Sequence, residues 1–202
     1  MYRNIIAKLE QIIMSSEARK TYSGSNLQRE VKSLDRDALS YCIKQHSRQT
    51  RDDGEPYYLH PMRVAAYAEH YIKGVNPFLV RNICLLHDVV EDCDILYEDI
   101  KGQFGEFVAD HVQDLTNVYT KESYPDLNRK DRKLREHERL EGCNNLVKQI
   151  KLIDRMDNCS PIKFAKNSKY LEETVDLINR IGNSNLEIKT LIEGKLTRWN
   201  SK

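Results

Sequence analysis

Apolar side chains recur every three or four residues along most of this 202-residue chain, which is the spacing of helices that bury one face. Residues 77–92 (PFLVRNICLLHDVVED) are apolar around most of a helical circumference, so we expect a central, buried helix there. No segment alternates between apolar and polar positions as a half-buried strand does. The pattern therefore predicts an all-α fold, with further helices at about 34–46, 62–73, 104–115, 127–141 and 146–158 and two more that separate near Gly182.

The N-terminal part of the chain differs from the rest. An amphipathic stretch with Ile5, Leu9 and Ile12 at helical spacing precedes a segment rich in Ser, Gly and charge at 15–30. Such a composition is typical of a linker or a loose loop. We therefore expect an N-terminal helix and linker at 1–33 and one domain at 34–202.

Composition and charge exclude several classes of protein. The 32 basic and 31 acidic residues nearly cancel, which gives no general electrostatic reason to bind nucleic acid or an anionic membrane. No apolar stretch approaches the roughly 18 residues that span a bilayer, and the N-terminus lacks a signal-peptide pattern. Five cysteines without a CxxC pair favour reduced thiols. We expect a cytoplasmic protein that binds neither nucleic acid nor membrane, and the sequence leaves its oligomeric state open.

Four ionisable side chains interrupt the end of the apolar run at 77–92, namely His87, Asp88, Glu91 and Asp92. His87 and Glu91 are four residues apart, so they would share one face of a helix, and the same spacing places Asp88 and Asp92 together. Buried carboxylates need a compensating positive charge, and a divalent metal supplies it economically. An exposed acidic helix end explains the same residues without a metal, so both interpretations stand at this point.

Two other positions extend this group. Asp154 interrupts a later apolar run, and His60 precedes a proline at an expected helix start. A salt bridge to Lys151 or Arg155 on the helix surface would equally explain Asp154, and helix capping or core packing would equally explain His60. Together with His87 and Asp88 they would form a site of two imidazoles and two carboxylates. Such ligands suit Mn, Fe or Zn and leave coordination positions open for water and substrate.

Four segments of the chain resemble one known family in order and spacing. They are TRDDGEPYYLHP at 50–61, LLHDVVED at 85–92, the stretch from FGEFV to LTNV at 104–118, and IKLIDRMDN at 150–158. The family is the hydrolase domain of RelA/SpoT-type enzymes, and the closer resemblance is to the stand-alone small alarmone hydrolase-like HD proteins. The resemblance covers about residues 34–180 and implies a helical HD-domain bundle with a mononuclear metal site. It also implies removal of the 3′-pyrophosphate from guanosine tetra- or pentaphosphate (ppGpp or pppGpp) with Mn²⁺ or another divalent metal.

The resemblance further implies roles for single residues. The residues already singled out by their pattern become the metal ligands and two carboxylates that orient water and transfer protons. Two further positions would lie beside the nucleoside. These positions are His60, His87, Asp88 and Asp154 for the metal, Glu91 and Asp92 for catalysis, and Arg51 and Asn158 for substrate binding.

A basic run at 129–139 offers a counterpart for the substrate phosphates. Arg129, Arg132 and Lys133 fall on one helical face by their spacing. One interpretation is a clamp on the substrate pyrophosphate, which guanidinium and ammonium groups bind well. A solvated helix face is the other interpretation, and the sequence does not decide between them.

Three features depart from the long enzymes of this family. Asp52 stands where they often carry a second basic residue, and Asp157 replaces a common histidine. The chain is also too short for their synthetase and regulatory domains, so we expect hydrolysis without synthesis. Asp52 motivates a second hypothesis, an HD phosphohydrolase of another nucleotide such as an adenosine alarmone, a deoxynucleotide or NADPH. A non-catalytic nucleotide-binding regulator is a third hypothesis, which the presence of Glu91 and Asp92 disfavours.

Overall fold

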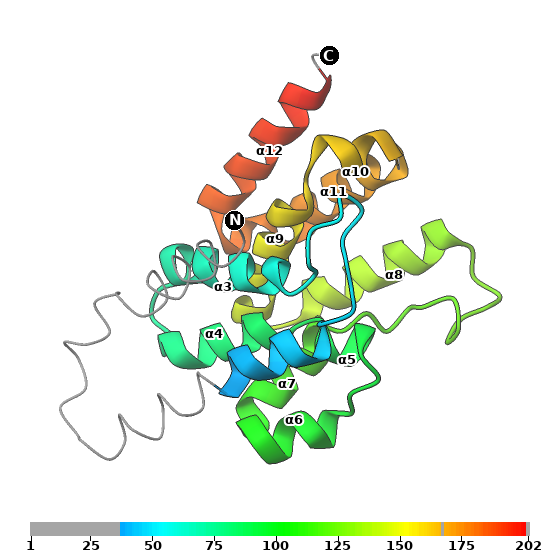
Figure 1. Cartoon of the computed structure of the whole chain (residues 1–202). Helices are drawn as coiled ribbons and strands as arrows, with labels where there is room; N and C mark the ends of the chain where they lie inside the picture. The colour runs from blue at the N-terminus through cyan, green and yellow to red at the C-terminus, as the bar shows by residue number, and fades with distance from the viewer. Residues whose placement is uncertain (1–36, 167, 201–202) are drawn as a thin grey trace.

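The computed structural model describes residues 37–166 and 168–200, and these ranges are helical over most of their length (Figure 1). The first helix spans residues 37–45. The described ranges contain no strand, only an isolated antiparallel bridge between Thr50 and Pro56, so the predicted all-α fold is confirmed. The later helices are α3 (Leu59–Tyr71), α4 (Pro77–Leu86), α5 (Val89–Asp92), α6 (Tyr97–Phe104), α7 (Glu106–Leu115), α8 (Arg129–Gly142), α9 (Asn145–Asn158), α10 (Pro161–Lys166), α11 (Ser168–Ile181) and α12 (Leu186–Asn200).

Helices α3, α4 and α9 form the centre of the fold. Helix α3 packs against both α4 and α9, and Figure 1 shows all three in the middle of the molecule. Met62, Ile83 and Ile150, one from each helix, are fully buried. Burying a side chain of this size contributes roughly 1.5–3 kcal/mol, so such contacts fix how the three helices cross. The candidate metal ligands lie on these helices or at their ends.

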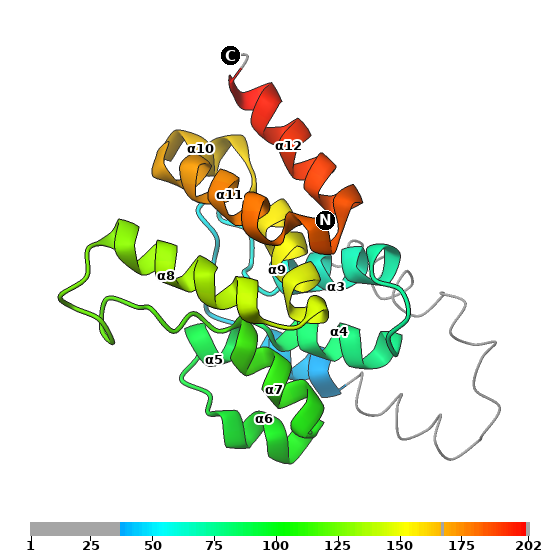
Figure 2. The same ribbon diagram turned by 180° about the vertical axis from the view of Figure 1, so that it is seen from behind.

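The remaining helices surround this centre. Helix α7 contacts α4 and α9 and pairs with α6, while α8 lies against α11 on the side seen in Figure 2. Helix α12 packs against α9 and projects from the body (Figure 1). Each helix within 37–166 and 168–200 is too short or too polar to cross a bilayer.

The predicted continuous helix at 77–92 is broken in the structure. Helix α4 ends at Leu86, His87 and Asp88 form a turn, and α5 follows as a single turn. His87 Nδ1 hydrogen-bonds to the carbonyl of Cys84 at 2.7 Å, the carbonyl that would accept the backbone N–H of Asp88 in a regular helix. This side-chain bond explains why the helix stops where the ionisable residues begin.

The helix predicted at about 104–115 is present as α7 and begins two residues later than expected. Gly105 has a φ of 87°, which separates α6 from α7. Residues other than glycine rarely adopt this left-handed backbone conformation. The expected N-terminal helix and linker at 1–33 lie outside the described residues, and the division of the chain near residue 34 stays a prediction. All five cysteines are free thiols, as the sequence favoured.

Candidate metal centre

His60 lies in the first turn of α3 with its imidazole buried. Its Nδ1 donates a hydrogen bond to Oδ2 of Asp157 at 2.7 Å, since a carboxylate can only accept. The other ring nitrogen, Nε2, is buried without a hydrogen-bond partner. It faces Oδ1 of Asp154 at 3.2 Å and Oδ2 of Asp88 at 3.6 Å.

His87 and Asp88 occupy the turn between α4 and α5. Because the backbone of Cys84 holds Nδ1 of His87, its Nε2 points away from α4 and is also buried without a partner. This nitrogen lies 3.2 Å from Oδ1 of Asp88 and 3.9 Å from Oδ1 of Asp154. The two imidazole rings meet edge to face, with centroids 5.3 Å apart.

Asp154 combines the two interpretations that the sequence left open. Its Oδ2 forms an ion pair with Lys151 Nζ at 2.9 Å, three residues earlier on α9. Its Oδ1 faces both imidazoles and accepts a hydrogen bond from the side-chain amide of Asn158 at 2.6 Å. The predicted salt bridge therefore exists, and the same carboxylate still presents an oxygen to the two histidines.

These donor atoms fit a divalent cation. Ligand atoms of His60, His87 and Asp154 lie within 4.8 Å of one another, and Asp88 adds oxygens at the distances given above. With Nδ1 of each ring committed elsewhere, the neutral form of either imidazole directs its Nε2 lone pair toward the carboxylate oxygens. Such a cluster of acceptors requires a positive charge at its centre. Two imidazoles with carboxylates suit divalent transition metals.

The charge balance of the group leads to the same conclusion. Burial alone lowers the pKa of an imidazole, but the carboxylates of Asp88 and Asp154 outweigh burial and raise the pKa of His87 to about 9. Burial opposes the ionised form of Asp154, yet Lys151 and the two histidines hold the pKa of this carboxyl well below its ordinary value. The site therefore attracts cations, protons included, and a metal competes with those protons.

A cavity of about 380 Å³ opens beside the candidate metal ligands. Asp88 and Asp154 contribute to its wall, and so do the two carboxylates predicted to be catalytic, Glu91 and Asp92. Glu91 Oε2 accepts the backbone N–H of Asn117 at 3.1 Å, which fixes one oxygen of this carboxylate. The structure therefore brings the two carboxylates among the predicted ligands and the two predicted proton-transfer residues to one cavity.

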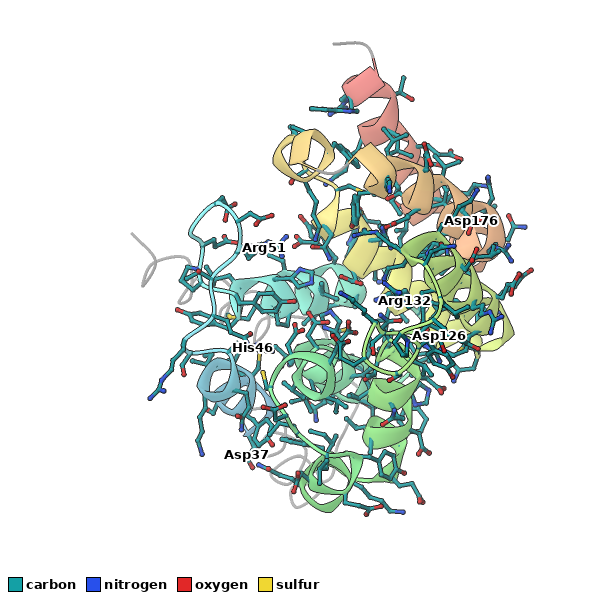
Figure 3. All side chains as sticks on the ribbon, turned by 90° about the vertical axis from the view of Figure 1, so that its right-hand side faces the viewer. Asp37, His46, Arg51, Asp126, Arg132 and Asp176 are labelled. Carbon is teal, nitrogen blue, oxygen red and sulfur yellow. The ribbon has the colours of Figure 1, made fainter. Side chains whose placement is uncertain are left out.

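Arg51 and Asn158, predicted beside the nucleoside, also line this cavity. Arg51 belongs to the loop before α3 (Figure 3), and its Nη2 donates to Oδ1 of Asn158 at 3.0 Å. Asp52, the acidic residue that raised the question of base selectivity, lines the same cavity. Tyr57 lines the cavity too, and its hydroxyl donates to Oδ2 of Asp88 at 2.8 Å.

The basic face predicted on α8 does not line the cavity. Arg129 pairs with Glu173 of α11 through two bonds, of 2.9 and 3.1 Å, and Arg132 donates to the carbonyl of Leu127. Burial lowers the pKa of the Lys133 ammonium, and the charges of Lys151 and Arg155 lower it further. Figure 3 shows Arg132 and Arg51 on different elements.

Other cations line the cavity in place of that face, namely Lys151, Arg155 and Lys163. Sequence reasoning did not assign them to the substrate. A signal existed for the first two, which are four residues apart on α9 and flank Asp154, so they share its side of the helix. Lys163 lies on α10, and no spacing in the sequence connects it to the site.

Comparisons with known proteins identify the family of the chain. The sequence matches the HD domain family over residues 38–183. The guanosine-3′,5′-bis(diphosphate) 3′-pyrophosphohydrolase MESH1 of Xenopus tropicalis is 28% identical over 170 residues, covering 79% of this chain and 89% of that protein. The probable enzyme of the same activity from Mycoplasma pneumoniae is 34% identical over 166 residues, covering 75% of this chain and 22% of that protein. The chain thus spans about a fifth of the length of this bacterial relative.

A solved structure also resembles this fold. It is described as a metazoan ortholog of SpoT that hydrolyses ppGpp, and it superposes with a TM-score of 0.71 at 22% identity. The match covers 88% of this chain and 97% of that one. At this level of identity, the likeness shows that the two chains share a fold.

Proposed function

This chain belongs to the HD domain family, and from that premise we propose that it is a metal-dependent pyrophosphohydrolase that removes the 3′-pyrophosphate of ppGpp or pppGpp. The observation that carries the proposal is the group formed by the two buried imidazoles and the Asp154 carboxylate. Asp88 lies beside this group, and both aspartates line a nucleotide-sized cavity. The relatives from Xenopus and Mycoplasma are named for this hydrolysis, and they support the choice of substrate.

In this proposal His60, His87, Asp88 and Asp154 hold the metal, and Mn²⁺ is the ion that the family resemblance favours. A bound divalent ion would act as a Lewis acid on the phosphoryl group and lower the pKa of a nearby water. The protein holds the ligand atoms ready for it, since Asp157 and the Cys84 carbonyl orient the two imidazoles.

Glu91 and Asp92 supply the proton transfer. Both carboxylates face the cavity, so either can accept a proton from the attacking water and return one to the leaving group. The Asn117 N–H holds one oxygen of Glu91 and leaves the other for water. Positioned general bases of this kind contribute about 10²- to 10⁴-fold to a rate.

The opposite charges on the cavity wall suit a polyphosphate nucleotide. Lys151, Arg155 and Lys163 supply positive charge for the phosphates, while Arg51 and Asn158 present a planar guanidinium and an amide to the nucleoside. The substrate is therefore expected to be a small molecule, a nucleotide with phosphates at two positions.

The test is hydrolysis of ppGpp by the purified full chain, with products separated by chromatography, in the presence and absence of Mn²⁺. The proposal expects pyrophosphate and GDP only when metal is present, and loss of turnover in Glu91→Gln. Glu106→Gln is the matched control, because Glu106 is an exposed glutamate paired with Lys101 on the neighbouring helix. Metal-loaded protein that leaves ppGpp intact overturns the choice of substrate.

One observation favours a second candidate, hydrolysis of a different nucleotide. Asp52 lines the cavity at a position where the long family enzymes often carry a basic residue, and Asp53 adds a second carboxylate to the wall. A panel of ppGpp, an adenosine alarmone, a deoxynucleoside triphosphate and NADPH distinguishes the two. Tight metal-dependent binding of ppGpp without any product would instead favour a regulator.

A further inference from the structure

The two imidazoles of the metal centre are held in different ways. A backbone carbonyl, that of Cys84, accepts from Nδ1 of His87, whereas a side chain, Asp157, accepts from Nδ1 of His60. The carboxylate of Asp157 is only 6% exposed. The orientation of His60 therefore depends on a residue that a point mutation can remove.

Asp157 is itself held by a second ion pair. Arg63 lies one turn after His60 on α3. It donates from Nε to Oδ1 of Asp157 at 2.8 Å and from Nη2 to Oδ2 at 3.0 Å. This two-bond geometry fixes the plane of a carboxylate. The remaining guanidinium nitrogen, Nη1, donates to both carboxylate oxygens of Glu55, at 2.9 and 2.8 Å.

The chain of contacts thus runs from Glu55 through Arg63 and Asp157 to His60. Without Arg63, Asp157 would be a nearly buried carboxylate with less compensating charge, free to turn away from the imidazole. Without Asp157, His60 would lose the acceptor that keeps its proton on Nδ1. The ring would then be free to carry its proton on Nε2, the atom that faces Asp88 and Asp154.

We propose that Asp157 and Arg63 are positioning residues that set the metal affinity of this protein by holding His60 with its Nε2 lone pair directed at the metal. The inference rests on the metal centre of the proposed function and assigns a role to a residue that departs from the histidine of the long enzymes. Partners of this kind behind a metal-bound histidine typically change metal affinity by about 10- to 100-fold.

Asp157 also connects the metal centre to the substrate side. Nη1 of Arg51 lies 3.7 Å from Oδ2 of Asp157, and Nη2 of Arg51 donates to Oδ1 of Asn158. Loss of the Asp157 carboxylate would therefore loosen both His60 and a cavity-wall guanidinium. Metal affinity and the KM for nucleotide are expected to change together in Asp157 variants.

The experiment is titration of the metal-free full chain with Mn²⁺, without nucleotide, followed by electron paramagnetic resonance of the unbound ion. Asp157→Asn preserves size and removes the charge, and it should weaken Mn²⁺ binding about 10- to 100-fold. Arg63→Gln should weaken it in the same direction. Wild-type affinity in Asp157→Asn overturns the proposal, and if that variant does not fold, wild-type affinity in Arg63→Gln overturns it instead.

The chain offers a matched control elsewhere. Asp176 of α11 accepts from Nδ1 of the buried His137 at the same 2.7 Å, and Figure 3 shows it on a different part of the molecule from Arg51. Asp176→Asn should lower thermal stability and leave Mn²⁺ affinity unchanged. An equal loss of affinity in this control would mean that the effect is structural, which would also overturn the proposal.

The outcome is separable from that of the proposed function. Mn²⁺ binding by the wild-type chain with no ppGpp hydrolysis would reject the substrate and leave the positioning role standing. Normal ppGpp hydrolysis together with wild-type Mn²⁺ affinity in Asp157→Asn would reject the positioning role alone.

Discussion

Asn158 donates its side-chain amide to Oδ1 of Asp154 at 2.6 Å, one turn earlier on α9, and accepts from Arg51 at 3.0 Å. One amide group therefore joins a carboxylate of the metal centre to a guanidinium of the cavity wall. An asparagine presents a donor and an acceptor at the two ends of the same plane, and neither an aspartate nor a leucine can make both bonds. The position of Arg51 depends on this residue.

Asn158→Leu should raise the KM for ppGpp by roughly 10- to 100-fold, because a hydrogen bond to a charged group contributes about 1.5–3 kcal/mol. Steady-state kinetics with Mn²⁺ at saturation measure this change. Asn128→Ala is the control, since its side chain caps α8 and its loss costs stability without touching the cavity. An unchanged KM in Asn158→Leu would contradict the proposed contact with the nucleoside.

Asp92 predicts an acidic limb in the pH profile of the enzyme. The surrounding protein and the charge of Asp88 raise the pKa of this carboxyl from 3.8 to about 6. A general base works only when ionised, so kcat/KM should rise with pH up to about 6 and then level off. Solvent reaches Asp92 and a metal bound beside Asp88 lowers its pKa, so the limb should lie at or below this value.

The effect of Asp92 on the stability of the fold should change with pH in the opposite direction to its effect on the rate. Because the folded protein binds this proton more tightly than the unfolded chain does, the protonated form is stabilising, and its contribution is lost as pH rises from about 4 through 6. Asp92→Asn should remove the acidic limb from the rate profile and the contribution of this one group from the stability profile. Rate measurements and thermal melts between pH 4 and 8 test this, and an acidic limb that survives in Asp92→Asn would assign it to another group.

Metal binding should stabilise the folded protein. A ligand present at 100 times its dissociation constant stabilises by about 2.7 kcal/mol, which for a chain of this size corresponds to roughly 5–10 °C in Tm. Thermal melts with and without Mn²⁺ measure the shift. His87→Ala removes a ligand and should abolish the shift, whereas His111→Ala, on the outer helix α7, should retain it. A full shift in His87→Ala would place the metal elsewhere.

Much of the fold could be predicted because helical periodicity is a local property of the sequence. Helix α9 was expected at 146–158 and spans Asn145–Asn158, since its apolar positions face the core at regular intervals. The break at His87 could not be predicted in this way. It depends on a side-chain bond to the Cys84 carbonyl, and a pattern of apolar positions carries no information about such a bond.

The candidate site shows the same division. His60, His87 and Asp154 stand out in the sequence because each interrupts or adjoins an apolar run, and the structure brings them together. Their supporting contacts depend on tertiary structure. Asp157 reaches His60 from a helix 97 residues later in the chain, so no local spacing connects the two residues.

The basic residues give the clearest contrast between a sequence pattern and a site. Arg129 belongs to a conspicuous basic face, yet its guanidinium pairs with Glu173 and lies outside the cavity wall. Lys163 has no such pattern, but it lines the cavity, and its Nζ lies 3.4 Å from Oδ1 of Asn158. Burial lowers the pKa of Lys163, while Asp154 opposes this.

We therefore expect Lys163→Met to raise the KM for ppGpp and Arg129→Met to leave it unchanged. Each substitution removes one positive charge and leaves the same methionine side chain, so the two variants match in charge and differ in position. An ammonium that contacts phosphate loses its contribution as salt screens it, so the difference between the variants should shrink between 50 and 500 mM NaCl. Equal KM values would show that Lys163 does not contact the substrate, and a higher KM in Arg129→Met alone would restore the clamp on α8.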